Sequence, residues 1–201
     1  MTSALKKEQH YTYADYEKWD EHPRCELIDG YIYMMASPTE AHQWISGGLY
    51  SQIRQFLRGK TCRVYSAPFD VRLNWDTTDD IVVQPDVFVV CDISKLEDGK
   101  NCKGAPDFVI EVLSPSTSIR DSTTKLDKYL QAKVREYWVV DPESKIVVAY
   151  RLIDDQYTTT IYNAEAKAPV TVLDGCTINL QEVFEGMLHD NESNKEHPEA
   201  Q

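Results

Sequence analysis

The stretch that decides the fold runs from Gln84 to Pro142. It contains three apolar runs: QPDVFVV at residues 84–90, DFVIEVL at 107–113 and YWVV at 137–140. Short runs rich in valine, isoleucine and aromatic residues are typical of strands. A polar, lysine-bearing pattern at residues 120–133 separates the second run from the third and indicates a helix. Strands and a helix in this order predict an α/β (α+β) domain built around a central sheet.

Two of these strands carry one acid each. Asp86 stands at the start of the first run, directly after Pro85, and Glu111 stands late in the second. Alternate side chains of a strand face opposite ways, so Glu111 shares its face with Val109 and Leu113. A carboxylate buried among apolar neighbours is costly unless a lysine or a metal ion offsets its charge. Two carboxylates on neighbouring strands are oxygen ligands suited to magnesium or manganese.

The helix that follows carries a lysine at a useful position. Asp121, Lys125 and Tyr129 are spaced four residues apart and can share one face. If this helix folds back across the strands, Lys125 reaches toward Glu111. The structural alternative is a surface ion pair between Asp121 and Lys125, which contributes only about 0.3–0.5 kcal/mol. Taken one at a time, each of these residues is more often structural than functional.

The N-terminal part predicts a short helix at residues 12–19, a hairpin at 24–35 and a long helix at 37–59. The hairpin is indicated by Asp29-Gly30 between two β-prone runs. Its first strand carries Glu26, which is either a solvated strand residue or a further acid near the site; the pattern alone favours the solvated alternative. His42, near the start of the long helix, is interpreted as structural, because a single histidine is seldom catalytic.

The rest of the chain predicts strands at residues 61–65 and 69–73, a polar loop at 75–80 and a polar connection at 94–105. Toward the C-terminus, residues 146–151 and 157–162 predict an antiparallel pair. A second hairpin-like return is expected from residues 170–173 to 177–180, before a brief helix at 181–187. We therefore expect one domain over residues 11–187, a flexible segment at 1–10 and an acidic, disordered tail at 188–201.

The charge of the chain limits its partners. The 201 residues include 21 basic and 33 acidic side chains, for a formal net charge of −12. Broad non-specific binding to DNA needs a basic surface, which this balance argues against. Residues 120–135, however, hold five basic side chains against two acidic ones, so a local basic face beside the acids remains open.

Compartment and redox state follow from what the sequence lacks. There is no apolar run of about 18 residues and no apolar core of a signal peptide, which predicts a cytoplasmic protein without a membrane span. The five cysteines are odd in number and form no C-x-x-C pair. We therefore expect reduced, semi-buried thiols rather than a disulfide framework or a zinc site.

Several motifs together resemble a known family, the Uma family of restriction endonucleases, formerly a domain of unknown function. They are ELIDG at 26–30 with Met35, the segment from Ser37-Pro38 to His42, QPDV at 84–87, GAPD at 104–107, EVLSPST at 111–117 with Asp121, Lys125 and Tyr129, and EYWVVDP at 136–142. The resemblance covers about residues 11–186. It implies a PD-(D/E)XK nuclease-like fold, that is, a restriction-endonuclease-like core with a mixed sheet flanked by helices. An extra N-terminal hairpin and C-terminal antiparallel strands would complete it.

The resemblance also implies site residues. Asp86 and Glu111 would be the two acids that bind Mg2+ or Mn2+, together with the carbonyl of Val112. The motif places its lysine two residues after the second acid, where this chain has Leu113, so the resemblance points to Lys125 on the following helix instead. Glu26 is carried over as a further site acid, against the preference from the pattern alone.

These expectations lead to two hypotheses. The first is a metal-dependent endonuclease that hydrolyses DNA phosphodiester bonds, with a homodimer expected because nuclease-like folds often cut two strands with two subunits. The second is a catalytically weak or inactive nuclease-like scaffold that acts in protein interaction or oligomerisation. The net charge of −12 and Leu113 at the usual lysine position favour the second.

Overall fold

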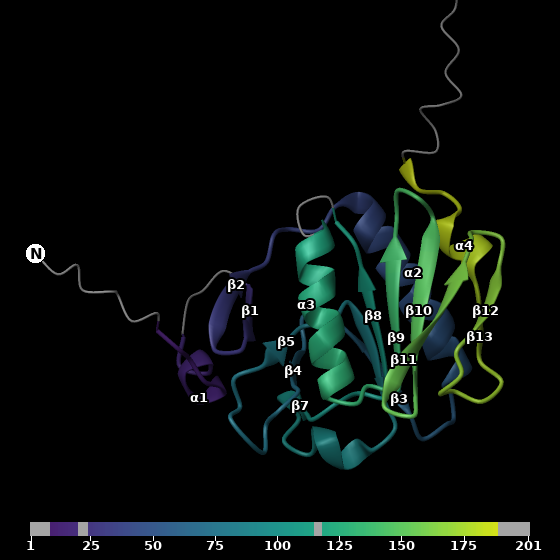
Figure 1. Ribbon diagram of the computed structural model, residues 1–201. Helices are drawn as coiled ribbons and strands as arrows, with labels where there is room; N and C mark the ends of the chain where they lie inside the picture. The colour runs from purple at the N-terminus through teal and green to yellow at the C-terminus, as the bar shows by residue number, and fades with distance from the viewer. Residues whose placement is uncertain (1–8, 20–23, 115–117, 189–201) are drawn as a thin grey trace, which may run out of the picture.

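The computed structural model describes residues 9–19, 24–114 and 118–188, without the side chains of residues 118–122 (Figure 1). Most of the N-terminal segment and of the acidic tail named above therefore lies outside the described residues. Gln9 and His10 are described, and His10 Nε2 lies 3.0 Å from Asp80 Oδ2.

The central element is a six-stranded sheet with the order β11-β10-β9-β8-β6-β3. Its strands are β3 (Arg63–Ser66), β6 (Val87–Val90), β8 (Phe108–Val112), β9 (Glu136–Asp141), β10 (Ile146–Ile153) and β11 (Gln156–Tyr162). Only β8 and β9 run parallel, so the sheet is mixed. The predicted strands of the deciding stretch are thus confirmed, and β8, which carries Glu111, is central and paired on both edges.

A second, five-stranded sheet has the order β2-β1-β5-β4-β7. Its strands are β1 (Cys25–Ile28), β2 (Tyr31–Met34), β4 (Asp70–Arg72), β5 (Val82–Val83) and β7 (Asn101–Lys103). The hairpin prediction is confirmed, because Asp29 and Gly30 both have positive φ, 52° and 76°. Strands β5 and β7 were not predicted, since runs of two and three residues carry too little periodicity to be recognised.

Helices cover both faces of the central sheet. In Figure 1, α3 (Ser118–Gln131) lies on the viewer's side of the sheet, to the left of β8, and α2 (Glu40–Phe56) lies behind the sheet. Ile45, Leu49 and Ile53 of α2 pack with Phe108 and Ile110 on one face, as their helical and strand spacings predict. On the other face, Tyr129 of α3 packs with Val109 and Tyr137. Glu111 belongs to this second face.

Shorter elements complete the chain. They are α1 (Tyr13–Tyr16), the 3-10 helix η1 (Ile93–Leu96), β12 (Lys167–Pro169), β13 (Thr177–Asn179) and α4 (Leu180–Phe184). The predicted return from residues 170–173 is wrong in detail, because β13 pairs with β12 instead. The amide of Leu173 donates to the carbonyl of Val170 at 3.1 Å, so this apolar run forms a turn that buries both side chains.

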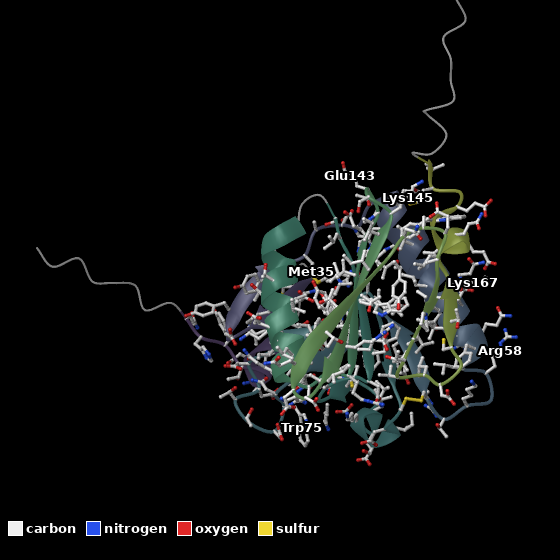
Figure 2. The ribbon with its side chains drawn as sticks, turned by 45° about the vertical axis from the view of Figure 1, so that its right-hand side comes forward. Met35, Arg58, Trp75, Glu143, Lys145 and Lys167 are labelled. Atoms are coloured by element: carbon white, nitrogen blue, oxygen red, sulfur yellow. A yellow bond between two sulfur atoms is a disulfide. The ribbon has the colours of Figure 1, made fainter. Side chains whose placement is uncertain are left out.

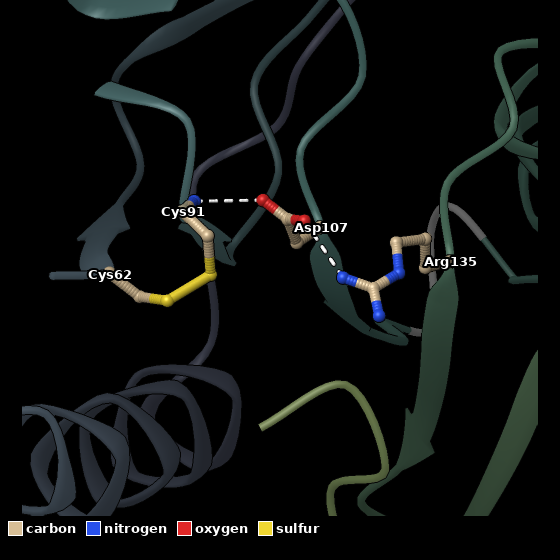
Figure 3. Close-up of a disulfide and its surroundings, with 4 residues drawn as sticks. All are labelled: Cys62, Cys91, Asp107 and Arg135. Atoms are coloured by element: carbon tan, nitrogen blue, oxygen red, sulfur yellow. Dashed lines mark hydrogen bonds and ion pairs between the residues drawn. A yellow bond between two sulfur atoms is a disulfide. The ribbon is translucent and has the colours of Figure 1, made fainter. Parts of the chain in front are cut away.

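The cysteine prediction is wrong for one pair. Cys62 and Cys91 form a disulfide, whereas Cys25, Cys102 and Cys176 are free and buried. The pair lies one step beyond the β3–β6 ladder, where Arg63 faces Val90, so strand register brings together two thiols 29 residues apart. No spacing motif could reveal this. Figure 3 shows Asp107 beside it, accepting from the Cys91 amide at 2.8 Å and pairing with Arg135 at 3.2 Å.

Candidate active site

A pocket of about 100 Å³ lies where the N-terminal part of α2, the β1–β2 hairpin, the end of β8 and α3 meet. Its charged and hydroxyl-bearing lining residues are Arg24, Glu26, Tyr33, Ser37, His42, Asp86, Glu111, Ser114, Lys125 and Tyr137. All four side chains expected at the site from the sequence, those of Asp86, Glu111, Lys125 and Glu26, are among them. Val112, expected to contribute its carbonyl, also lines this pocket.

Strand pairing brings the two strand acids together. Val87 of β6 faces Ile110 of β8 in an antiparallel ladder. One step further along, Asp86 therefore comes opposite Glu111. Asp86 Oδ2 also accepts a hydrogen bond of 2.8 Å from the amide of Val112. The N–H and C=O of one strand residue point to the same edge, so the Val112 carbonyl also faces the Asp86 side of β8.

Lys125 joins two acids that come from different sheets. Its Nζ lies 3.0 Å from Glu111 Oε1 and 2.8 Å from Glu26 Oε1, and the residue is only 9% exposed. Tyr129, one helical turn later, donates to the same Glu111 oxygen at 2.7 Å. The shared helix face expected for Lys125 and Tyr129 is thus present and turned onto Glu111. The side chain of Asp121 lies outside the described residues, so its proposed pairing with Lys125 is not seen.

Glu26 is buried, and the pattern-based preference for a solvated residue is wrong. Its side chain faces α3, where Lys125 Nζ lies 2.8 Å from Glu26 Oε1, and the residue is only 5% exposed. Besides Lys125, the Glu26 carboxylate accepts a hydrogen bond of 2.8 Å from the amide of Gln84. The alternation within four residues could not reveal this, because all four residues of β1 are buried.

The site also includes His42, which was interpreted as structural. Thr39 caps α2, and His42 lies in the first turn, with its Nε2 3.1 Å from Asp86 Oδ2. A single histidine has no spacing signal, and its partner lies 44 residues away in the sequence. Only the contact between the start of α2 and the start of β6 shows that His42 is held against a site acid.

The electrostatics of the pocket reflect two buried carboxylates, Glu26 and Glu111, that contact one lysine, and a third, partly buried carboxylate at Asp86. Burial raises the pKa of Glu111 to about 7, with further upward contributions from Asp86 and Glu26 that Lys125 only partly offsets. Burial by itself would lower the pKa of Lys125, but the charges of Glu111 and Glu26 outweigh it and raise that pKa. The pKa of His42 is also raised, because its hydrogen bond to Asp86 and the charges of Asp86 and Glu111 outweigh the effect of burial.

The donor set fits a hard divalent cation. Among the described residues, no hydrogen bond reaches Glu111 Oε2 or Asp86 Oδ1, so each carboxylate keeps one oxygen for a ligand. Those residues contain no cluster of three or more His, Cys, Asp or Glu side chains arranged to hold a metal. Magnesium is commonly bound by one or two carboxylates and retains several waters, so two acids with one carbonyl suit it.

Three polar atoms of pocket-lining residues lack partners in the described part of the chain. They are Arg24 Nη2, His42 Nδ1 and Tyr137 Oη, all buried. Buried polar groups in native proteins are nearly always hydrogen-bonded to protein or to water. The Arg24 nitrogen is a donor and the Tyr137 hydroxyl can be one, so an oxygen-rich ligand or water would satisfy them.

Known proteins resemble this chain in sequence and in fold. Residues 13–181 match the Uma2 family, which is described as "Putative restriction endonuclease". "Uncharacterized protein slr1290" of Synechocystis sp. is 31% identical over 146 residues, which span 70% of this chain and 74% of that protein. The fold is similar to a crystal structure described as "a putative nuclease belonging to DUF820" from Anabaena variabilis, with a TM-score of 0.71 and 23% identity. That similarity covers 87% of this chain and 97% of the other.

Proposed function

The chain belongs to the Uma2 family of nuclease-like proteins, and from this premise we propose that it is a metal-dependent endonuclease that hydrolyses DNA phosphodiester bonds. One observation carries the proposal. Lys125 lies between Glu111 and Glu26 in a pocket that Asp86 also lines. A helix lysine thereby reaches the second acid of the motif, although Leu113 occupies the usual lysine position.

In this proposal Asp86, Glu111 and the Val112 carbonyl hold Mg2+ or Mn2+. When bound, the ion supplies Lewis acidity toward the phosphate and lowers the pKa of a coordinated water. The excess of buried carboxylates supports a divalent cation, since it would offset the charge that Lys125 leaves uncompensated.

The remaining residues orient the reactants. The Lys125 ammonium positions the attacking water or stabilises the negative charge that develops on the phosphate. Glu26 and Tyr129 fix the position of that ammonium and of Glu111. His42 holds Asp86 through Nε2. The unpartnered donors of Arg24 and Tyr137 are suited to phosphate oxygens.

A nicking assay on supercoiled DNA with Mg2+ or Mn2+ tests the proposal. We expect cleavage by the wild type and a loss of at least 100-fold in Asp86→Asn and in Glu111→Gln. Asp107→Asn is a matched control, because Asp107 adjoins the other end of β8 and is held by Arg135 and the Cys91 amide. Equal activity in wild type and both site variants would refute the assignment of these acids.

The scaffold hypothesis is favoured by a different observation. Strand β2 is an edge of its sheet and pairs only with β1 within the described residues. Its side chains Tyr31, Ile32, Tyr33 and Met34 are 40–59% exposed. An exposed apolar edge strand is a surface through which chains associate. We propose that two copies form a homodimer through β2.

Sedimentation velocity tests this dimer. Ile32→Lys should give a monomer, because lysine on an edge strand opposes strand pairing. If Ile32→Lys still forms a stable dimer, the assignment of the interface to β2 is contradicted. A dimer that shows no cleavage and no metal binding would favour the scaffold over the enzyme.

No helix in the described part of the chain has the length and apolar character needed to cross a membrane. A cytoplasmic location stays a proposal. The Cys62–Cys91 disulfide is evidence against a cytoplasmic location, because disulfides are rare in reducing compartments.

A further inference from the structure

A second hollow, of about 330 Å³, lies at the C-terminal end of α2. Arg54, Arg58, Lys60 and Arg63 line it, together with Leu57, Cys62, Val64 and Tyr65. We call it the basic groove. Figure 2 labels Arg58 of this groove and Met35 of the pocket at separate places on the molecule.

The basic groove stands out against the charge of the whole chain. No acid occurs between Glu40 and Asp70, although the chain has 33 acidic residues and a net charge of −12. All four cationic residues of the groove are exposed, and none forms an ion pair with a described residue. Lys60 Nζ instead lies 3.2 Å from the centre of the Phe56 ring. Four unneutralised cations in one hollow create a local positive potential that attracts an anion.

Helix α2 connects the groove to the pocket, and after Glu40 at its first position it carries no acidic residue. Its exposed residues Gln43, Gly47, Ser51 and Arg54 recur every three or four positions, so they lie on one face. A Cβ added at Gly47 would have no atom within 4 Å, so this face of the helix is open. His42 contacts the site acid at one end of the helix, and Arg54 enters the groove at the other.

We propose that the basic groove binds the phosphate backbone of nucleic acid at a distance from the phosphate that reacts, with α2 as the surface between them. The inference rests on the proposed nuclease function and assigns a second region of the protein that holds the DNA substrate. His42 and Arg54 are 12 residues apart, which corresponds to roughly 18 Å along a helix. That is about five base pairs at 3.4 Å each. A duplex of 24 base pairs is therefore long enough to reach both sites.

Fluorescence anisotropy with a labelled 24-base-pair DNA duplex tests the groove. Full-length wild type is compared with Arg54→Ala/Arg58→Ala in EDTA, at several salt concentrations. Each phosphate contact makes the slope of log K against log salt more negative by about 0.9. Losing two contacts should therefore make the slope less negative by about 2. At 0.1 M salt this corresponds to roughly 60-fold weaker binding.

The matched control is Lys100→Ala/Lys133→Ala, which removes the same charge from two surface lysines paired with Glu17 and Asp155. It should change the slope by less than 0.5. An equal loss in both double variants would overturn the proposal, because net charge and not the groove would then determine binding. Unchanged binding in the groove variant would overturn it as well.

Hydrolysis of bis(p-nitrophenyl) phosphate with Mn2+ separates this inference from the proposed function. This small diester fills only the pocket, so the groove variant should keep the wild-type rate while it loses cleavage of long DNA. If wild type fails to hydrolyse either substrate but the groove still governs duplex binding, the nuclease proposal fails and the groove stands. If the groove variant cleaves long DNA like wild type, the groove assignment fails and the nuclease stands.

Discussion

Replacing Lys125 with methionine removes the only lysine among the described residues that line the pocket, while leaving its packing volume nearly intact. Its Nζ lies within 3.0 Å of both Glu26 and Glu111, and the residue is 9% exposed. Removing one partner of a buried ion pair typically costs 3–5 kcal/mol, because the remaining charge is left uncompensated. We expect Lys125→Met to lower the free energy of unfolding at pH 7.5, without metal, by about that amount.

The control is a lysine with the same kind of contact and a different environment. Lys133 Nζ lies 2.8 Å from Asp155 Oδ1, but the two side chains are 53% and 81% exposed. Lys133→Met should cost less than about 1 kcal/mol. Urea unfolding followed by circular dichroism gives both values.

The pH dependence of Lys125→Met provides a second readout. Lys125 is the strongest influence that lowers the pKa of Glu111, so its loss should raise that pKa further above about 7. A folded-state pKa above the unfolded value of 4.5 means that the native state binds the proton more tightly. The stability of the variant should therefore fall as the pH rises from 4.5 through 7 and beyond, and more steeply than that of wild type.

A double variant gives the decisive result. Glu111→Gln removes one of the two orphaned charges, so Lys125→Met/Glu111→Gln should be more stable than Lys125→Met by about 1–3 kcal/mol. If Lys125→Met costs no more than Lys133→Met, or if Glu111→Gln brings no recovery, the buried charge cluster described here is wrong.

Three further outcomes follow from the described residues. Tyr129→Phe removes a hydrogen bond of 2.7 Å to Glu111 and should lower the free energy of unfolding in urea by about 1.5–3 kcal/mol. An unchanged free energy would mean that the hydroxyl is hydrated in the native protein. In thiol titration the unfolded chain should show three thiols without reductant and five after reduction, because Cys62 and Cys91 form a disulfide. The thiols of the native protein should react slowly, since burial raises the pKa of Cys102 to about 12 and of Cys176 to about 11. Gly30→Ala should lower stability by about 1–2 kcal/mol, because φ is +76° and a Cβ would lie 2.2 Å from the His10 ring; an unchanged melting temperature would contradict the turn geometry.

Much of the fold could be predicted from local patterns. The hairpin at Asp29-Gly30, the apolar face of α2 and the alternation in β8 each depend on neighbours within about four residues, so the sequence alone identifies them. The same alternation placed Glu111 on one face of β8, and helical spacing placed Lys125 and Tyr129 together. Short strands such as β5 and the pairing of β13 with β12 were missed, because partners distant in the sequence decide them.

The sequence by itself determined which residues are the candidates for the chemistry: two acids on neighbouring strands and a lysine on the next helix. Tertiary structure alone decided how they are charged and held. Glu26 is buried where α3 covers its face of β1, and Lys125 of that helix contacts both glutamates there. The pairing of His42 with Asp86 arises where α2 meets β6. The physical reason is that burial and pairing depend on distances between elements, and the pattern within one element contains no information on those distances.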